Sequence, residues 1–64
     1  MYSLEFGVPY HCTGRVFTVS GDWEFSGLSF TDGSLFHFLD ADRGRFVSVP
    51  FVDAHVSSAR AFPE

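Results

Sequence analysis

The sequence predicts an all-β fold, a small five-stranded barrel in which consecutive strands pair as a meander. Three observations predict it. Apolar and polar residues alternate over short runs, which is the period of a strand. Turn residues, including an Asp-Gly pair, separate these runs. No stretch shows the longer periodicity of an amphipathic helix. At 64 residues the chain is expected to be one domain, residues 1–64.

The N-terminal residues 1–10 are expected to form an arm or a short strand. Tyr2, Leu4 and Phe6 recur at period two, and Gly7 and Pro9 then interrupt the run. The stretch from His11 to Ser20 is predicted to be the first full strand, and the turn Ser20-Gly21-Asp22 leads into the next one.

The stretch from Trp23 to Phe51 carries most of the large apolar side chains and is predicted to hold three strands. Trp23 and Phe25 share one face of the first strand. The apolar positions then change phase at Leu28 and Phe30, and Gly27 lies at the change. We therefore expect the two faces to swap there, through a bulge or a sharp bend.

Asp32-Gly33 is predicted to form a tight hairpin turn, because glycine adopts a positive φ without strain. The strand that follows, Leu35 to Leu39, is nearly continuous in apolar character. Such strands are typically covered on both faces, and we expect the same here.

The polar turn 40–45 leads to a strand over 46–51, which should end at Pro50 or lie at an edge because proline has no N–H to donate. Residues 52–55 are short and irregular and fit a single 3₁₀ turn. The last strand is predicted over Val56 to Phe62, with its even-numbered residues on one face.

Composition narrows the class of partner. The formal net charge is −4, there is no lysine, and four arginines are the only basic residues apart from histidine. Nucleic-acid affinity depends on neutralising phosphates with Lys and Arg, so a protein partner is favoured over nucleic acid. The nine Phe, two Tyr and one Trp exceed what so small a core can enclose. Some should lie at the surface, as at partner or subunit contacts.

Cys12 is the single cysteine, so an internal disulfide is excluded and a reducing compartment is favoured. The N-terminus lacks the charged and apolar regions of a signal peptide. No apolar run is long enough to span a membrane. These features predict a cytoplasmic protein that makes no membrane contact.

No residue constellation points to catalysis, a metal or a cofactor. Asp40 and Asp42 have the D-x-D spacing that begins an EF-hand calcium loop. The twelfth position of such a loop must be a bidentate Glu, and here it is Phe51. The histidines and Cys12 lack the paired spacing of zinc ligands. His11 and Cys12 are adjacent in a strand and point to opposite faces, so they cannot act as base and nucleophile. His37 is expected to be a strand histidine with a satisfied ring nitrogen.

The remaining candidates are binding residues. Arg43-Gly44-Arg45 is the only concentrated positive charge, and it either contacts a phosphate or carboxylate or offsets the two aspartates across the turn. Trp23 either stacks on bases or belongs to the core or a subunit contact. The predicted binding residues are Trp23, Asp32, Arg43, Arg45 and His55.

Residues 16–63 resemble the Sm-like superfamily of small barrels, in Hfq-like or Rof-like form. The first family motif is matched by Gly27, Leu28, Asp32 and the apolar run 35–38, and the second by residues 52–58. In the second motif Asp53 stands near the place of the family's RNA-binding basic residue. The Asp-Gly turn and the Val-Pro strand end are similar to the Rof type. The resemblance implies an SH3/Sm-like barrel and a ring of subunits.

The sequence thus predicts a non-enzymatic interaction module, a homo-oligomer that binds another macromolecule. Sm-like barrels associate by pairing their fourth and fifth strands between neighbours. The expected subunit interface comprises Phe46, Val47, Val49, Val56, Ser58 and Phe62. The alternative is an RNA-binding Sm-like ring.

Overall fold

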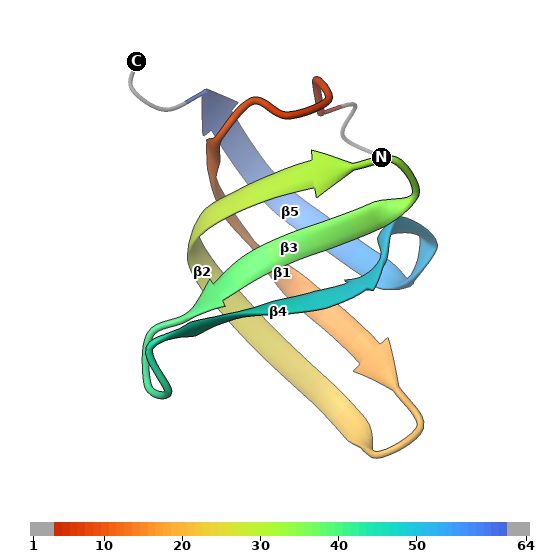
Figure 1. The fold of residues 1–64 in the computed structure, drawn as a ribbon. Coiled ribbons are helices and arrows are strands. Elements are labelled where there is room, and N and C mark those ends of the chain that lie inside the picture. Colours follow the sequence, from red (N-terminus) through yellow and green to blue (C-terminus); the bar gives the residue numbers. More distant parts are fainter. Residues whose placement is uncertain (1–3, 62–64) are drawn as a thin grey trace.

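The computed structural model describes residues 4–61 and contains five antiparallel strands in one open sheet, ordered β4-β3-β2-β1-β5 (Figure 1). No α-helix forms within these residues. The elements are β1 (Tyr10–Thr18), β2 (Gly21–Asp32), β3 (Leu35–Asp40), β4 (Arg45–Pro50), the 3₁₀ turn η1 (Phe51–Asp53) and β5 (Ala54–Ala61). The all-β prediction is confirmed, including the strand end at Pro50. A 3₁₀ turn does precede the last strand, but it lies at Phe51–Asp53 rather than within 52–55, and β5 begins at Ala54 rather than Val56.

Strand β2 is long enough to belong to both halves of the sheet. Its residues from Gly21 to Ser29 pair with β1, and those from Ser29 to Asp32 pair with β3. Between these segments β2 curves, so that β3 and β4 cross in front of β1 (Figure 1). The two halves therefore face each other, and their inward side chains form one core.

Three phenylalanine rings dominate that core. Phe25 of β2 lies 5.1 Å, centroid to centroid, from both Phe36 and Phe38 of β3. Such ring pairs stabilise the fold beyond the area that they bury. The other buried apolar residues are Cys12, Val16, Val49 and Ala54. The core thus draws on all five strands.

The predicted change of face at Gly27 is wrong. The register between β1 and β2 is unbroken through the Cys12–Gly27 pair, so there is no bulge at this position. Gly27 instead adopts a positive φ of 142° within the regular strand. Ser29 and Thr31 point inward and are buried, whereas Phe30 is partly exposed. Ser29 is accommodated because its hydroxyl donates to the Gly27 carbonyl oxygen (3.2 Å), which meets the hydrogen-bonding need of a buried polar group.

The irregularity of the sheet lies instead between β1 and β5. Thr13 pairs with Ser58 and Gly14 pairs with Val56, so Ser57 is an extra residue in β5. Val56 therefore packs against the core, while Ser58 is exposed and its hydroxyl lies 2.6 Å from the Thr13 hydroxyl. The expectation that even-numbered residues of this strand share a face is wrong, because the bulge reverses the alternation.

Residues 4–9 form an arm rather than a strand. Leu4 packs against the core, the Gly7 N–H donates to the Thr31 carbonyl oxygen (3.0 Å), and the Glu5 N–H donates to the Tyr10 hydroxyl (3.0 Å). These contacts tie the arm to β1 and β2. The predicted apolar position at Tyr2 lies outside the described residues.

Candidate interaction surfaces

The outward side of β3, of the second half of β2 and of the start of β4 carries several large apolar side chains. Because β2 keeps its alternation through Gly27, Leu28 and Phe30 point away from the core. The register places His37 opposite Phe30, and Phe46 opposite Leu39. This outer face, as we call it, comprises Leu28, Phe30, Leu35, His37, Leu39 and Phe46.

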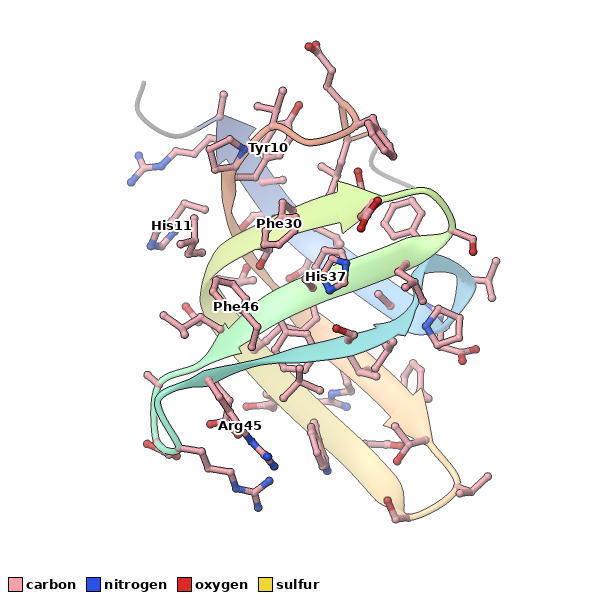
Figure 2. The ribbon with its side chains drawn as sticks, viewed as in Figure 1. Tyr10, His11, Phe30, His37, Arg45 and Phe46 are labelled. Atoms are coloured by element: carbon pink, nitrogen blue, oxygen red, sulfur yellow. The ribbon has the colours of Figure 1, made fainter. Side chains whose placement is uncertain are left out.

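Aromatic rings run across the outer face from β2 to β4 (Figure 2). The Phe30 ring stacks on His37 at 4.7 Å and meets Phe46 edge-on at 5.5 Å. Leu35 is 40% exposed and Phe46 is 42% exposed. The prediction that the strand Leu35 to Leu39, now β3, is covered on both faces is therefore wrong for its outer side. Phe30 is missing from the predicted binding residues, although extending the Trp23 and Phe25 alternation through Gly27 places it outside.

His37 is held firmly within the outer face. Its Nδ1 lies 2.6 Å from the Ser48 hydroxyl, and its side chain is only 15% exposed. Its Nε2 has no hydrogen-bond partner and lies 3.7 Å from an Asp32 carboxylate oxygen. The expectation of a satisfied ring nitrogen is confirmed for Nδ1. Of the predicted binding residues, Asp32 thus borders the outer face from the end of β2.

The two outermost strands of the sheet are β4 and β5, the strands predicted to pair between subunits. The predicted interface residues on them differ in exposure. Phe46 and Ser58 are exposed, and Val47 and Val56 are partly buried against the core. Val49 belongs to the core itself. Phe62 lies outside the described residues.

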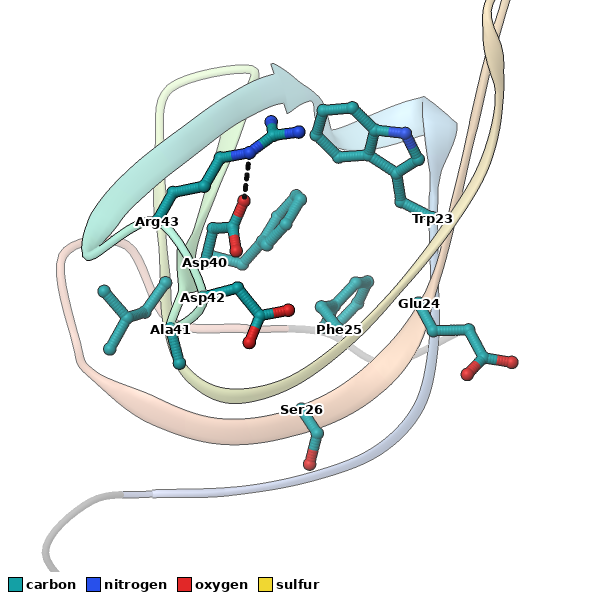
Figure 3. Close-up of a pocket in the computed structure, with 10 residues that line it drawn as sticks. Trp23, Glu24, Phe25, Ser26, Asp40, Ala41, Asp42 and Arg43 are labelled. Atoms are coloured by element: carbon teal, nitrogen blue, oxygen red, sulfur yellow. Dashed lines mark ion pairs between the residues drawn. The ribbon is translucent and has the colours of Figure 1, made fainter.

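A cavity of about 380 Å³ opens between the first half of β2 and the turn that joins β3 to β4 (Figure 3). It brings together Trp23 and Arg43, two predicted binding residues from distant parts of the sequence. The Arg43 guanidinium carbon lies 5.8 Å from the Trp23 ring centroid, and Arg43 Nε lies 3.8 Å from an Asp40 carboxylate oxygen. Arg43 therefore does offset Asp40 across the turn, one of the two predicted roles.

The other predicted binding residues lie elsewhere. Arg45 begins β4 opposite Asp40, is exposed and does not line the cavity. His55 is exposed on β5, where its ring meets Phe17 edge-on at 4.6 Å. The five predicted binding residues are thus divided among four regions and do not form one site.

The Cys12 thiol is inaccessible to solvent. The residue is fully buried, and burial raises the pKa of its thiol, an effect opposed in part by a hydrogen bond with Ser29. His11 is exposed on the opposite side of β1, so the two side chains do not pair. Across residues 4–61 no group of three or more His, Cys, Asp or Glu side chains is placed to hold a metal ion.

Comparisons with family models, curated proteins and solved structures gave no match for this chain. In the part of the chain that the structure describes, no helix has the length and apolar character needed to cross a membrane.

Proposed function

We propose that this chain is a non-enzymatic interaction module, a small SH3/Sm-like barrel that self-associates and binds another macromolecule, a protein rather than nucleic acid, in the cytoplasm. The observation that carries the proposal is the outer face. Large apolar side chains on three adjacent strands remain partly exposed there, and exposed apolar patches of this kind mark interaction sites.

The curvature of β2 and the strand order support the barrel. The sheet bends back on itself, and β4 and β5 are its two edges, joined by the three residues of η1. A short connection of this kind keeps the two edges close to each other. This arrangement fits the Sm-like order of strands that the sequence resembles.

Self-association follows from the same two edges. An edge strand presents unpaired backbone N–H and C=O groups, and pairing with a second chain satisfies them. Phe46 lies on β4 and belongs to the outer face, so pairing of this edge would also cover part of that face. If β4 of one copy pairs with β5 of the next, the contact is heterologous and closes into a ring when the rotation allows.

A charge placed at Phe46 tests this proposal. Phe46→Asp introduces a carboxylate beside the β4 edge without entering the core, and Val19→Asp adds the same charge in the fully exposed β1–β2 turn. Size-exclusion chromatography with light scattering should show a lower mass for Phe46→Asp and an unchanged mass for Val19→Asp. Equal masses for parent and Phe46→Asp, with both folded by circular dichroism, would remove β4 from the interface.

A second candidate function is an RNA-binding Sm-like ring, and the stacked Phe30 and His37 rings favour it, since bases stack on such platforms. Arg15 and Arg43, however, already pair with carboxylates, those of Glu24 and Asp40 respectively. Fluorescence polarisation with U-rich or A-rich RNA at about 150 mM salt decides between the two. Nanomolar affinity would put RNA binding first.

A further inference from the structure

The cavity beside Trp23 combines an aromatic wall with carboxylates. Trp23 of β2 forms one side, and the turn after β3 forms the other (Figure 3). Phe25 and Phe38 contribute apolar surface, and Asp40 and Asp42 contribute negative charge. Glu24 also lines the cavity, but its carboxylate accepts a hydrogen bond from Arg15 at 2.9 Å. Asp40 and Asp42 are therefore the carboxylates left to meet a positively charged ligand.

Arg43, which itself lines the cavity, already places a guanidinium against both kinds of wall. Its guanidinium lies between the Trp23 indole and the Asp40 carboxylate (Figure 3). An aromatic face and a carboxylate both attract a cation, the first by a cation–π contact and the second by a charge-assisted hydrogen bond. The contacts are loose, however. The distance of 5.8 Å to the indole is near the limit for a cation–π contact, and the distance of 3.8 Å to Asp40 is too long for a hydrogen bond.

The side chains of Asp40 and Arg43 differ in their exposure to solvent. The Asp40 side chain is 21% exposed, whereas that of Arg43 is 57% exposed. The Asp40 carboxylate is thus the more sheltered of the two groups. The backbone of the turn is held separately, because the Asp40 carbonyl oxygen accepts the Arg43 and Gly44 N–H groups at 3.2 and 2.8 Å. Arg43 projects from that turn and is mostly in solvent, so its side chain is free to move aside while the turn stays intact.

We propose that this cavity binds an arginine side chain of a protein partner, which displaces Arg43 from between Trp23 and Asp40. The inference rests on the proposed function as a protein-binding module and adds the chemistry of the partner. A guanidinium fits better than an ammonium group, because it is planar, stacks on an indole and donates two parallel hydrogen bonds to one carboxylate. The net charge of −4 favours a basic partner.

Arg43 then acts as an internal competitor, and its removal should strengthen binding. An exposed cation–π contact is worth about 0.5–1 kcal/mol, so the occupied form of the cavity outweighs the open form by about two- to fivefold. A ligand that needs the open form loses affinity by the corresponding factor. Arg43→Ala should therefore tighten binding of an arginine peptide by about threefold or more.

Arg45→Ala is the matched control, because it removes the same charge two residues away without altering the cavity lining. The probes are three twelve-residue peptides that alternate glycine with arginine, lysine or citrulline. Citrulline keeps the shape of arginine and lacks its charge. Binding is measured at about 150 mM salt by calorimetry and by the fluorescence of Trp23, the only tryptophan in the chain.

The proposal predicts that the arginine peptide binds most tightly, that Arg43→Ala strengthens its binding more than Arg45→Ala does, and that Asp40→Asn weakens it at least tenfold. Equal gains from the two arginine variants, or equal affinity for arginine and lysine peptides, would show general charge attraction and overturn it. Arg43→Gln replaces Arg43→Ala if the latter unfolds. Failure of all three peptides, in a chain that still self-associates, would refute this cavity as an arginine site and leave the proposed function standing.

Discussion

Gly14→Ala is the sharpest test of the packing between β1, β2 and β5. A Cβ at Gly14 would lie 2.7 Å from Phe25 Cζ and 2.9 Å from Val56 Cα, and it would also collide with the His55 carbonyl oxygen. Real Cβ atoms essentially never approach other atoms within 3.0 Å. Two of these three contacts are with backbone, so no change of rotamer relieves them, and β5 must move away from β1.

The expected cost of Gly14→Ala is about 2 kcal/mol, the middle of the range for overpacking a core. For a domain of this size, that loss lowers the melting temperature by about 8–16 °C. Thermal unfolding followed by circular dichroism measures it, and Ser26→Ala, on the exposed side of β2, serves as a control that should change little. Adding Phe25→Leu should not restore stability, since the backbone contacts remain. A Gly14→Ala chain that melts with the parent would refute the close approach at the bulge.

Three further predictions concern single side chains. Gly27→Val should destabilise the fold by about 1–3 kcal/mol, because φ of 142° is unfavourable for a branched residue although no atom lies within 4 Å of a Cβ there; an unchanged melting temperature would contradict this. Burial raises the pKa of the Cys12 thiol above its ordinary value of 9.0, so the proton is held more tightly in the folded chain. The contribution of Cys12 to the free energy of unfolding should be complete below the ordinary thiol pKa and should be lost as the pH rises through the higher pKa of the folded chain. Urea melts between about pH 8 and about pH 10 should therefore show a smaller loss of stability in Cys12→Ala than in the parent. Ser48→Ala removes the 2.6 Å partner of His37 Nδ1 and should cost about 1 kcal/mol, a loss that denaturant melts would detect and that Ser26→Ala should not reproduce.

The strands were predictable because their signals are local. Alternation and turn residues such as Asp32-Gly33 depend on neighbours in the chain. The hairpin does form there, with Gly33 and Ser34 as the turn residues between Asp32 of β2 and Leu35 of β3. The offset of Asp40 by Arg43 was predictable for the same reason, since the two residues are three positions apart. Local patterns therefore give the elements and the contacts within a turn.

The faces of the strands depend on their partners, which a local pattern does not reveal. Ser29 is buried although the predicted swap of faces at Gly27 would have turned it outward. Its burial is tolerated because its hydroxyl donates to the Gly27 carbonyl oxygen. The bulge at Ser57 arises because its neighbours Ser58 and Val56 pair with the consecutive residues Thr13 and Gly14 of β1, a strand distant in the sequence. Trp23 meets Arg43 only because β2 curves. The outer face and the cavity are both products of such long-range pairing.

The mass of the chain in solution tests the proposed self-association most directly. One chain has a mass of 7.2 kDa, and a fold this small would gain stability by covering exposed apolar surface and open strand edges between copies. Light scattering at micromolar concentration should give a mass several times that of one chain. A 7.2 kDa species that stays folded on dilution would contradict self-association and leave a module that binds its proposed partner as a single chain.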